Sequence, residues 1–537
     1  MLSYRKLAMR VLGRPLHTEG IDSPRPASQR AAALVLTAAM LTTLAAPAFA
    51  KTWYIENGNI TVKAGKIEGT NKVSQGETTD EKDTDTVITN RDKDTASSHT
   101  VTINANGKND KVEVTLKDVN IEANSGHALT SNGDVTLTLK GENHLTGGNG
   151  GRYGGSGITS NGSLTISGGE NDSLTAQGGS GANGISSSGS LTISGGTVTA
   201  NGDDGGRGIS SSGSVTISGG STVTANGGSG TISGGDGIWS GGGVTISGGS
   251  TVTANGGNGG SLVGGDGIRS GGGLTVSDGT VTAKGGNGDS KDGYGGDGIR
   301  SGGVVTISGN TVNAAGGYGG KVGGYGICSF DRVAISGGTV EAAGGNGSTG
   351  GGSGIYSSVI DLSGSLELTA KAGSPNGRAL SQNGSELKLD DIKDKLGPGA
   401  KVTATDADGK VIDQVSTPRP VEPEESSSSS DGGSAAPSAP ASPLPGLTVT
   451  DKDGQRISYT STQSGNTLTV CVGRFTASFR ISLAALRQLR AEGIETITFQ
   501  TILCSTTLSV DELLAMGGED AEAVLTHRFT DSSLTVG

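Results

Sequence analysis

A three-part phrase recurs between about residue 157 and residue 355 of this chain. A Gly-Ile-x-Ser segment is followed by a Leu-Thr-Ile-Ser-Gly-Gly segment and then by Thr-Val-Thr-Ala. The isoleucines of the first segment return every 24 to 31 residues, at Ile158, Ile185, Ile209, Ile238, Ile268, Ile299, Ile327 and Ile355. Self-similarity at such a period is typical of solenoids, in which each repeat stacks on its neighbours.

Composition favours the same architecture. The 537 residues include 99 glycines, and only 31% are hydrophobic and 3% aromatic, which is little bulky side chain for a conventional globular core. A solenoid coil needs to bury only narrow strips of Ile, Leu, Val and Ala side chains against its neighbours. Alternation within the phrase turns Leu191, Ile193, Val198 and Ala200 inward and Thr192 outward. Three such strips with glycine-rich corners predict an all-β, right-handed parallel β-helix of about ten coils, each about 4.8 Å high.

The chain divides into five segments by composition. Basic residues, an apolar stretch at 31–46 and the triplet Ala48-Phe49-Ala50 indicate a secretion signal, with the mature chain starting at Lys51. The apolar stretch is short for a membrane anchor, and no transmembrane segment is expected after signal removal. The predicted segments are a signal peptide at 1–50, an N-terminal cap with irregular first coils at 51–125, the β-helix repeats at 126–415, a Pro/Ser-rich linker at 416–445 and a small α+β module at 446–537.

The C-terminal module shows patterns of both strand and helix. Strands are expected near 468–472, 475–481 and 496–500, and a helix over 483–492 closed by Gly493. A second helix is expected to begin at the capping-box pattern formed by Ser509 and Glu512. The three cysteines, Cys328, Cys471 and Cys504, are an odd set that makes no disulfide framework, although a pair between Cys471 and Cys504 stays open.

One order of phrases resembles a known family. The run at 112–121, the Gly-Glu-Asn-His-Leu-Thr segment at 141–146 and the later coils together resemble secreted bacterial surface proteins of a kind common in gut Firmicutes. These are related to carbohydrate-binding right-handed β-helix domains, and the resemblance covers about residues 53–390. It implies a right-handed β-helix at the cell surface with a polysaccharide-binding or adhesive role.

The residue before each Gly-Ile forms a column if the coils stack. It includes three consecutive aspartates, Asp236, Asp266 and Asp297, whose charges would repel one another about one coil apart. A bound Ca²⁺ is one way to offset these charges, since carboxylates in glycine-rich turns suit this cation. Neighbouring arginines are another. The simpler structural interpretation is that each aspartate bonds to the backbone of its own turn.

The residue after each Gly-Ile is expected to point outward beside the same edge. This row displays Trp239, Arg269, Arg300 and Tyr356. An exposed aromatic ring beside guanidinium groups suits a sugar face and a uronate or sulfate group, so these four residues are the candidate ligand-binding site. The alternative is a solvated row in which Arg269 and Arg300 pair with Asp266 and Asp297.

Three functions are compatible with these features. The favoured one is a secreted, adhesin-like protein that binds a polysaccharide or cell-surface glycan without catalysis. A structural spacer that displays the C-terminal module is the second, and a polysaccharide lyase or hydrolase is the third. Lyase or hydrolase chemistry needs a distinct set of carboxylates or bases, and no single coil breaks the repeat to supply one. The net charge of −12 argues against nucleic acid and anionic membranes as main partners.

Overall fold

The computed structural model describes residues 50–418 and 446–536, with short gaps. The gaps lie at residues 68, 106, 108–109, 151–153, 452–455, 458, 465, 473–475, 502–504, 517–520 and 529–530. The expected signal peptide, apart from Ala50, and residues 419–445 of the expected linker lie outside the described residues. Strands make up 53% of the structure and helices 6%, so the all-β prediction is confirmed.

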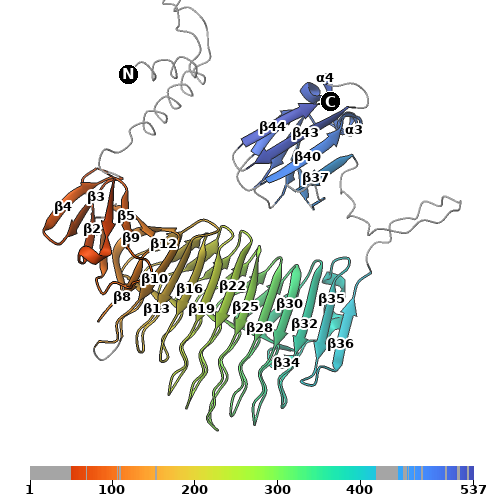
Figure 1. Ribbon diagram of the computed structural model, residues 1–537. Helices are drawn as coiled ribbons and strands as arrows, with labels where there is room; N and C mark the ends of the chain where they lie inside the picture. The colour runs from red at the N-terminus through yellow and green to blue at the C-terminus, as the bar shows by residue number, and fades with distance from the viewer. Residues whose placement is uncertain are drawn as a thin grey trace, which may run out of the picture.

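Each coil of the repeat region contributes three short strands. In one coil these are β20 (Ile238–Ser240), β21 (Val244–Ile246) and β22 (Ser250–Asn255). Each strand pairs in parallel with its equivalents in the coils before and after. Ile238 lies opposite Ile209 on one side and Ile268 on the other, as the repeat predicts. The result is a parallel β-helix, which Figure 1 shows as a ladder of stacked strands.

The strands form three rows along the β-helix. The first row, which carries the Gly-Ile segments, comprises β2 (Ile60–Ala64), β6 (Val101–Ala105), the first half of β9 (Leu129–Lys140), β11 (Ile158–Ser160), β14 (Ile185–Ser187), β17 (Ile209–Ser211), β20, β23 (Ile268–Ser270), β26 (Ile299–Ser301), the first parts of β29 (Ile327–Ile335) and β31 (Ile355–Leu362), and β33 (Leu380–Gln382). The second row comprises β1 (Lys51–Tyr54), β5 (Thr86–Thr89), β7 (Lys111–Lys117), the second half of β9, β12 (Leu164–Ser167), β15 (Leu191–Ser194), β18 (Val215–Ser218), β21, β24 (Leu274–Val276), β27 (Val305–Ile307) and the last parts of β29 and β31.

The third row forms a separate sheet of the β-helix. It comprises β8 (Asn120–Glu122), β10 (Glu142–Thr146), β13 (Ser173–Gln177), β16 (Thr197–Asn201), β19 (Thr222–Asn226), β22, β25 (Gly279–Lys284), β28 (Thr311–Ala315), β30 (Gly338–Ala343), β32 (Leu366–Lys371) and β35 (Lys401–Thr405). Inward side chains of all three rows form one continuous core of Ile, Leu, Val and Ala.

The coil count differs from the expected ten and is about 13. The additional coils lie in 51–125, where β1, β5 and β7 already stack in parallel without the Gly-Ile phrase. Burial of alternate residues such as Ile60 and Val62 is enough to form these coils, so they escape a search for the phrase. At about 4.8 Å per coil, the β-helix is roughly 60 Å long.

Both ends of the β-helix are closed by irregular elements. At the N-terminal end, β3 (Asn71–Gln75) and β4 (Thr78–Asp83) form an antiparallel hairpin after η1 (Ile55–Asn57) and β2. At the C-terminal end, η2 (Leu389–Lys395) buries Leu389 and Ile392, β34 (Ser385–Glu386) pairs with β33, and β36 (Val411–Ser416) pairs antiparallel with β35. These elements cover the sheet edges that would otherwise be open to pairing.

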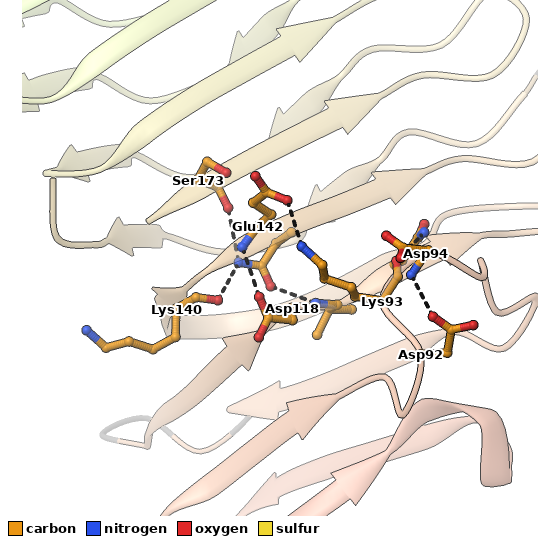
Figure 2. A network of polar contacts seen from close by, with 10 residues as sticks. Asp92, Lys93, Asp94, Asp118, Lys140, Glu142 and Ser173 are labelled. Carbon is orange, nitrogen blue, oxygen red and sulfur yellow. Dashed lines mark hydrogen bonds and ion pairs between the residues drawn. The ribbon is translucent and has the colours of Figure 1, made fainter. Parts of the chain in front are cut away.

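The first coils are joined by polar side chains in place of the glycine repeat. Figure 2 shows Lys93 reaching across to Glu142, with Nζ and Oε2 3.2 Å apart. Asn143 is fully buried, accepts a hydrogen bond from the Val119 backbone N–H and donates to the carbonyl of Ser173. Because each of these contacts bridges different coils, they tie the early coils together.

The C-terminal module is an α+β unit, as predicted. One sheet contains β37 (Leu447–Thr450), β40 (Thr476–Ser482), β43 (Glu522–Arg528) and β44 (Asp531–Val536), and the other contains β38 (Thr460–Ser464), β39 (Thr467–Cys471), β41 (Thr496–Gln500) and β42 (Ser505–Ser509). The helices are α3 (Leu483–Ala491) and α4 (Val510–Ala515). Ser509 caps α4 by accepting from the Glu512 N–H, which confirms the predicted helix start. Phe479 and Phe499 meet in the core with ring centres 4.9 Å apart.

Candidate ligand-binding groove

Glycine-rich loops connect the third row to the first row of the next coil, and they also stack. One arm of successive loops is joined by parallel bridges through Gly230, Gly259, Gly288, Gly319 and Gly347. The other arm is joined through Ser233, Val263, Tyr294, Val322 and Gly350. We call these loops, residues 227–236, 256–266, 285–297, 316–325 and 344–353, the loop stack.

The arms of the loop stack touch backbone to backbone, which requires glycine. The Gly265 N–H donates to the Gly257 carbonyl within one loop, and the Gly257 N–H donates to the Gly235 carbonyl of the preceding loop, both at 2.8 Å. A Cβ atom on Gly256 would lie 1.9 Å from the carbonyl oxygen of Gly265. Any side chain here would therefore separate the arms.

A groove of about 890 Å³ lies between the loop stack and the outward side of the first row. It runs over six coil levels, from Asn183 to Tyr325, a length of about 24 Å at 4.8 Å per coil. The side chains that line it are Asn183, Arg207, Ser233, Asp236, Val263, Asp266, Arg269, Tyr294, Asp297, Arg300, Val322 and Tyr325. Five of the seven residues predicted as site residues thus share one groove.

The aspartate column forms the buried side of this groove. Asp236, Asp266 and Asp297 are 6%, 6% and 4% exposed. Oδ1 of Asp236 accepts from the Asp266 N–H at 2.9 Å, and Oδ1 of Asp266 accepts from the Asp297 N–H at 2.7 Å. Oδ1 of Asp297 accepts in the same way from Tyr325 at 2.7 Å. Each carboxylate therefore bonds to the backbone of the next coil rather than to its own turn.

Arginines form ion pairs with Asp236 and Asp297 but not with Asp266, which lies between them. Nε of Arg207 lies 3.2 Å from Oδ2 of Asp236, and Nη1 of Arg300 lies 3.3 Å from Oδ2 of Asp297. Asp266 has no ion pair among the described residues. Burial, followed by the charges of Asp297 and Asp236, raises the pKa of Asp266 to about 8. Burial also raises the pKa of Asp297 to about 6, opposed by the Tyr325 N–H and Arg300.

The aspartates lie one above another, with a single carboxylate in each coil. Within the described residues, no three or more His, Cys, Asp or Glu side chains lie close enough together to hold a metal ion. Peptide N–H groups and arginines supply the offset to the negative charge. Calcium binding at Asp236, Asp266 and Asp297 stays a prediction that a binding measurement has to test.

The two predicted aromatic residues flank the groove rather than line it. The guanidinium of Arg207 lies 4.5 Å from the ring centre of Trp239, so one face of this ring already has a cationic partner. Tyr356 stacks on Tyr325 with ring centres 4.9 Å apart and planes at 19°. Only Tyr325 of this pair lines the groove.

Arg269 and Arg300 differ, although both occupy the same row. Arg300 pairs with Asp297, as the solvated-row alternative proposed. Arg269 is exposed and makes no hydrogen bond or ion pair to any residue in the described parts of the chain. The predicted pairing of Arg269 with Asp266 is absent.

The residues of the opposite wall of the groove were not among the predicted site residues, although they lie in the longest insertions between the third and first rows. Val263 and Tyr294 lie in the outer arms of the loop stack and are 41% and 43% exposed. Their equivalent positions in consecutive loops, Val263, Tyr294 and Val322, are the signal that could have identified this wall. Aligning the loops requires knowing how insertions of unequal length stack, which the sequence does not provide.

Cys328 occupies the outward row but is covered by its neighbours. It is 1% exposed, and burial raises the pKa of its thiol to about 12, so the thiol is unreactive at neutral pH. Cys471 is also a free thiol, and Cys504 lies outside the described residues.

Comparison of the chain with protein-family models, curated proteins and solved structures gave no match. Among the described residues, no helix is both long and apolar enough to span a membrane.

Proposed function

We propose that this protein is a secreted, cell-surface β-helix that binds glycans along the groove without cleaving them. The observation that carries the proposal is the pairing of two unlike walls over consecutive coils. One wall presents Val263 and Tyr294, and the other presents arginines of the first row. Sugar rings have apolar faces and polar edges, so a chain of them suits an apolar wall opposite a wall of hydrogen-bond donors.

The regular spacing of the groove supports an extended ligand. Equivalent positions repeat about every 4.8 Å along its length. A polysaccharide is itself a repeating chain, and successive units can make similar contacts with successive coils. A small compact ligand would use only one or two of the six levels.

The aspartates support binding rather than catalysis. Each one gives an oxygen to the backbone of the next coil and is almost fully buried. A general acid or base has to reach the proton that it transfers in a plausible substrate pose. Their shared arrangement over three coils indicates a structural role in joining the coils, with no distinct catalytic coil.

The experiment is a glycan array with the full chain, followed by calorimetry on the glycans that bind. Tyr294→Ala is expected to weaken binding about tenfold, because it removes the largest apolar surface of the loop wall. Tyr318→Ala is the matched control, since Tyr318 is 48% exposed but does not line the groove. Equal losses in the two variants, or no glycan bound at all, would contradict the proposal and favour a structural spacer.

A further inference from the structure

The charges of the groove differ from level to level. At the Arg207 level, the guanidinium is engaged by both Asp236 and the Trp239 ring. At the Arg300 level, it is engaged by Asp297 and lies 5.2 Å from the ring centre of Phe330. Between these levels, Arg269 is exposed and makes no hydrogen bond or ion pair in the described parts of the chain, although its charge acts on Asp297.

The aspartates beside Arg269 make no ion pair with it. The charge of Arg269 acts on Asp297, but this carboxylate pairs with Arg300. Asp266 is 6% exposed, and its Oδ1 is held by the Asp297 N–H. Burial and two neighbouring aspartates favour its neutral form, as its raised pKa indicates. Among the described cations that line the groove, Arg269, near the middle of the groove's length, is therefore the one without an ion pair. Lys321 does not line the groove, and its Nζ lies 5.6 Å from the ring centre of Tyr294.

Resting on the proposed function, we infer that the groove takes a largely neutral glycan that carries one carboxylate or sulfate group at the Arg269 level. The planar guanidinium can bind either group through two parallel hydrogen bonds. Val263 lines the groove from the loop of this level and Tyr294 from the next loop, and both suit the neutral sugars beside the charged one.

A polyanionic glycan fits this groove poorly. Its next charged unit would meet Arg207 or Arg300, each of which already shares its charge with a buried aspartate. Breaking either pair would leave an aspartate buried without its countercharge, which costs free energy. A glycan with many negative charges is therefore expected to bind to the groove more weakly than a glycan with one.

The test compares three probes on the full chain by calorimetry. They are a neutral xylo-oligosaccharide, the same oligosaccharide with a single glucuronate branch, and a polygalacturonate fragment of similar length. The single-branch probe is expected to bind about tenfold or more tightly than the neutral one. Arg269→Ala should remove this preference and leave affinity for the neutral probe unchanged, while Arg269→Lys retains part of it.

Arg332→Ala is the control for general loss of positive charge, because Arg332 is exposed, pairs with Asp361 and lies outside the groove. It should leave all three affinities unchanged. Equal binding of the neutral and single-branch probes, or tightest binding of polygalacturonate, overturns this inference and leaves the proposed function standing. Binding of none of the three probes, with no glycan bound on the array, overturns both.

Discussion

The residue at the position of the aspartates joins successive coils through a side-chain oxygen. Asn183 occupies the position of the aspartates two coils before Asp236, and its Oδ1 accepts from the Arg207 N–H at 2.8 Å. An amide thus performs the same backbone contact without a charge. The contact, rather than the charge, is what joins the coils at this position.

Asp266→Asn is expected to stabilise the β-helix at alkaline pH. The amide keeps the acceptor for the Asp297 N–H and removes the cost of ionising a buried carboxyl. At pH 8.5 the free energy of unfolding should rise by about 1–3 kcal/mol. Urea unfolding followed by tryptophan fluorescence measures this, because both tryptophans, Trp53 and Trp239, lie in the β-helix.

Asp266→Ala is the control for that experiment. It removes the acceptor as well as the charge, which leaves the Asp297 N–H buried without its partner at a cost of about 1–3 kcal/mol. An asparagine variant no more stable than the wild-type chain at pH 8.5 would show that ionisation of Asp266 carries no cost in the folded state. An asparagine variant no more stable than the alanine variant would show that the hydrogen bond to the Asp297 N–H contributes nothing.

At the scale of elements, the sequence predicts the strands well and the loops poorly. The isoleucines of the first row lie in register from Ile158 to Ile355, as the phrase indicates, since alternation fixes which side chains face inward. The pairing of Arg300 with Asp297 was one of two predicted alternatives. The absence of an ion pair at Arg269 was not predictable, because both arginines occupy the same position in the repeat. Tyr294 was missed for a related reason: its neighbours come from other coils.

Gly265→Ala is expected to disrupt the loop stack. A Cβ atom on Gly265 would lie 1.9 Å from the carbonyl oxygen of Gly235 in the preceding loop. The loops would have to separate, and we expect a loss of about 3 kcal/mol or more in the free energy of unfolding.

Gly350→Ala is the matched control in the same loop stack, since the nearest atom to its Cβ would be a Val322 methyl at 3.8 Å. Its effect should stay within about 0.5 kcal/mol. Urea unfolding under identical conditions compares the two variants, and similar losses would mean that contact between the arms is not what requires glycine.

At the scale of the whole molecule, the described residues form two separate hydrophobic cores. One runs through the coils of the β-helix, and the other lies within 446–536. A buried group with a shifted pKa lies beside each core: Asp266 at the groove of the β-helix and His527 against Phe479 of the C-terminal module. His527 is fully buried, its Nε2 lies 2.9 Å from Oγ1 of Thr506, and burial lowers its pKa.

These two groups predict unfolding transitions that respond to pH in opposite directions. Folded Asp266 holds its proton up to about pH 8, whereas the unfolded chain releases it near 3.8, so the stability of the β-helix falls as pH rises from about 4 to about 8. Folded His527 resists protonation that the unfolded chain accepts near pH 6.5, so the stability of the C-terminal module falls as pH drops from 6.5 to 5. Scanning calorimetry across pH 5–8.5 should resolve both changes, with tryptophan fluorescence assigning the β-helix transition. Asp266→Asn should flatten only the fall in β-helix stability with rising pH, and His527→Gln only the fall in stability of the C-terminal module with dropping pH. A variant that alters both changes equally would show that the two cores unfold as one cooperative unit.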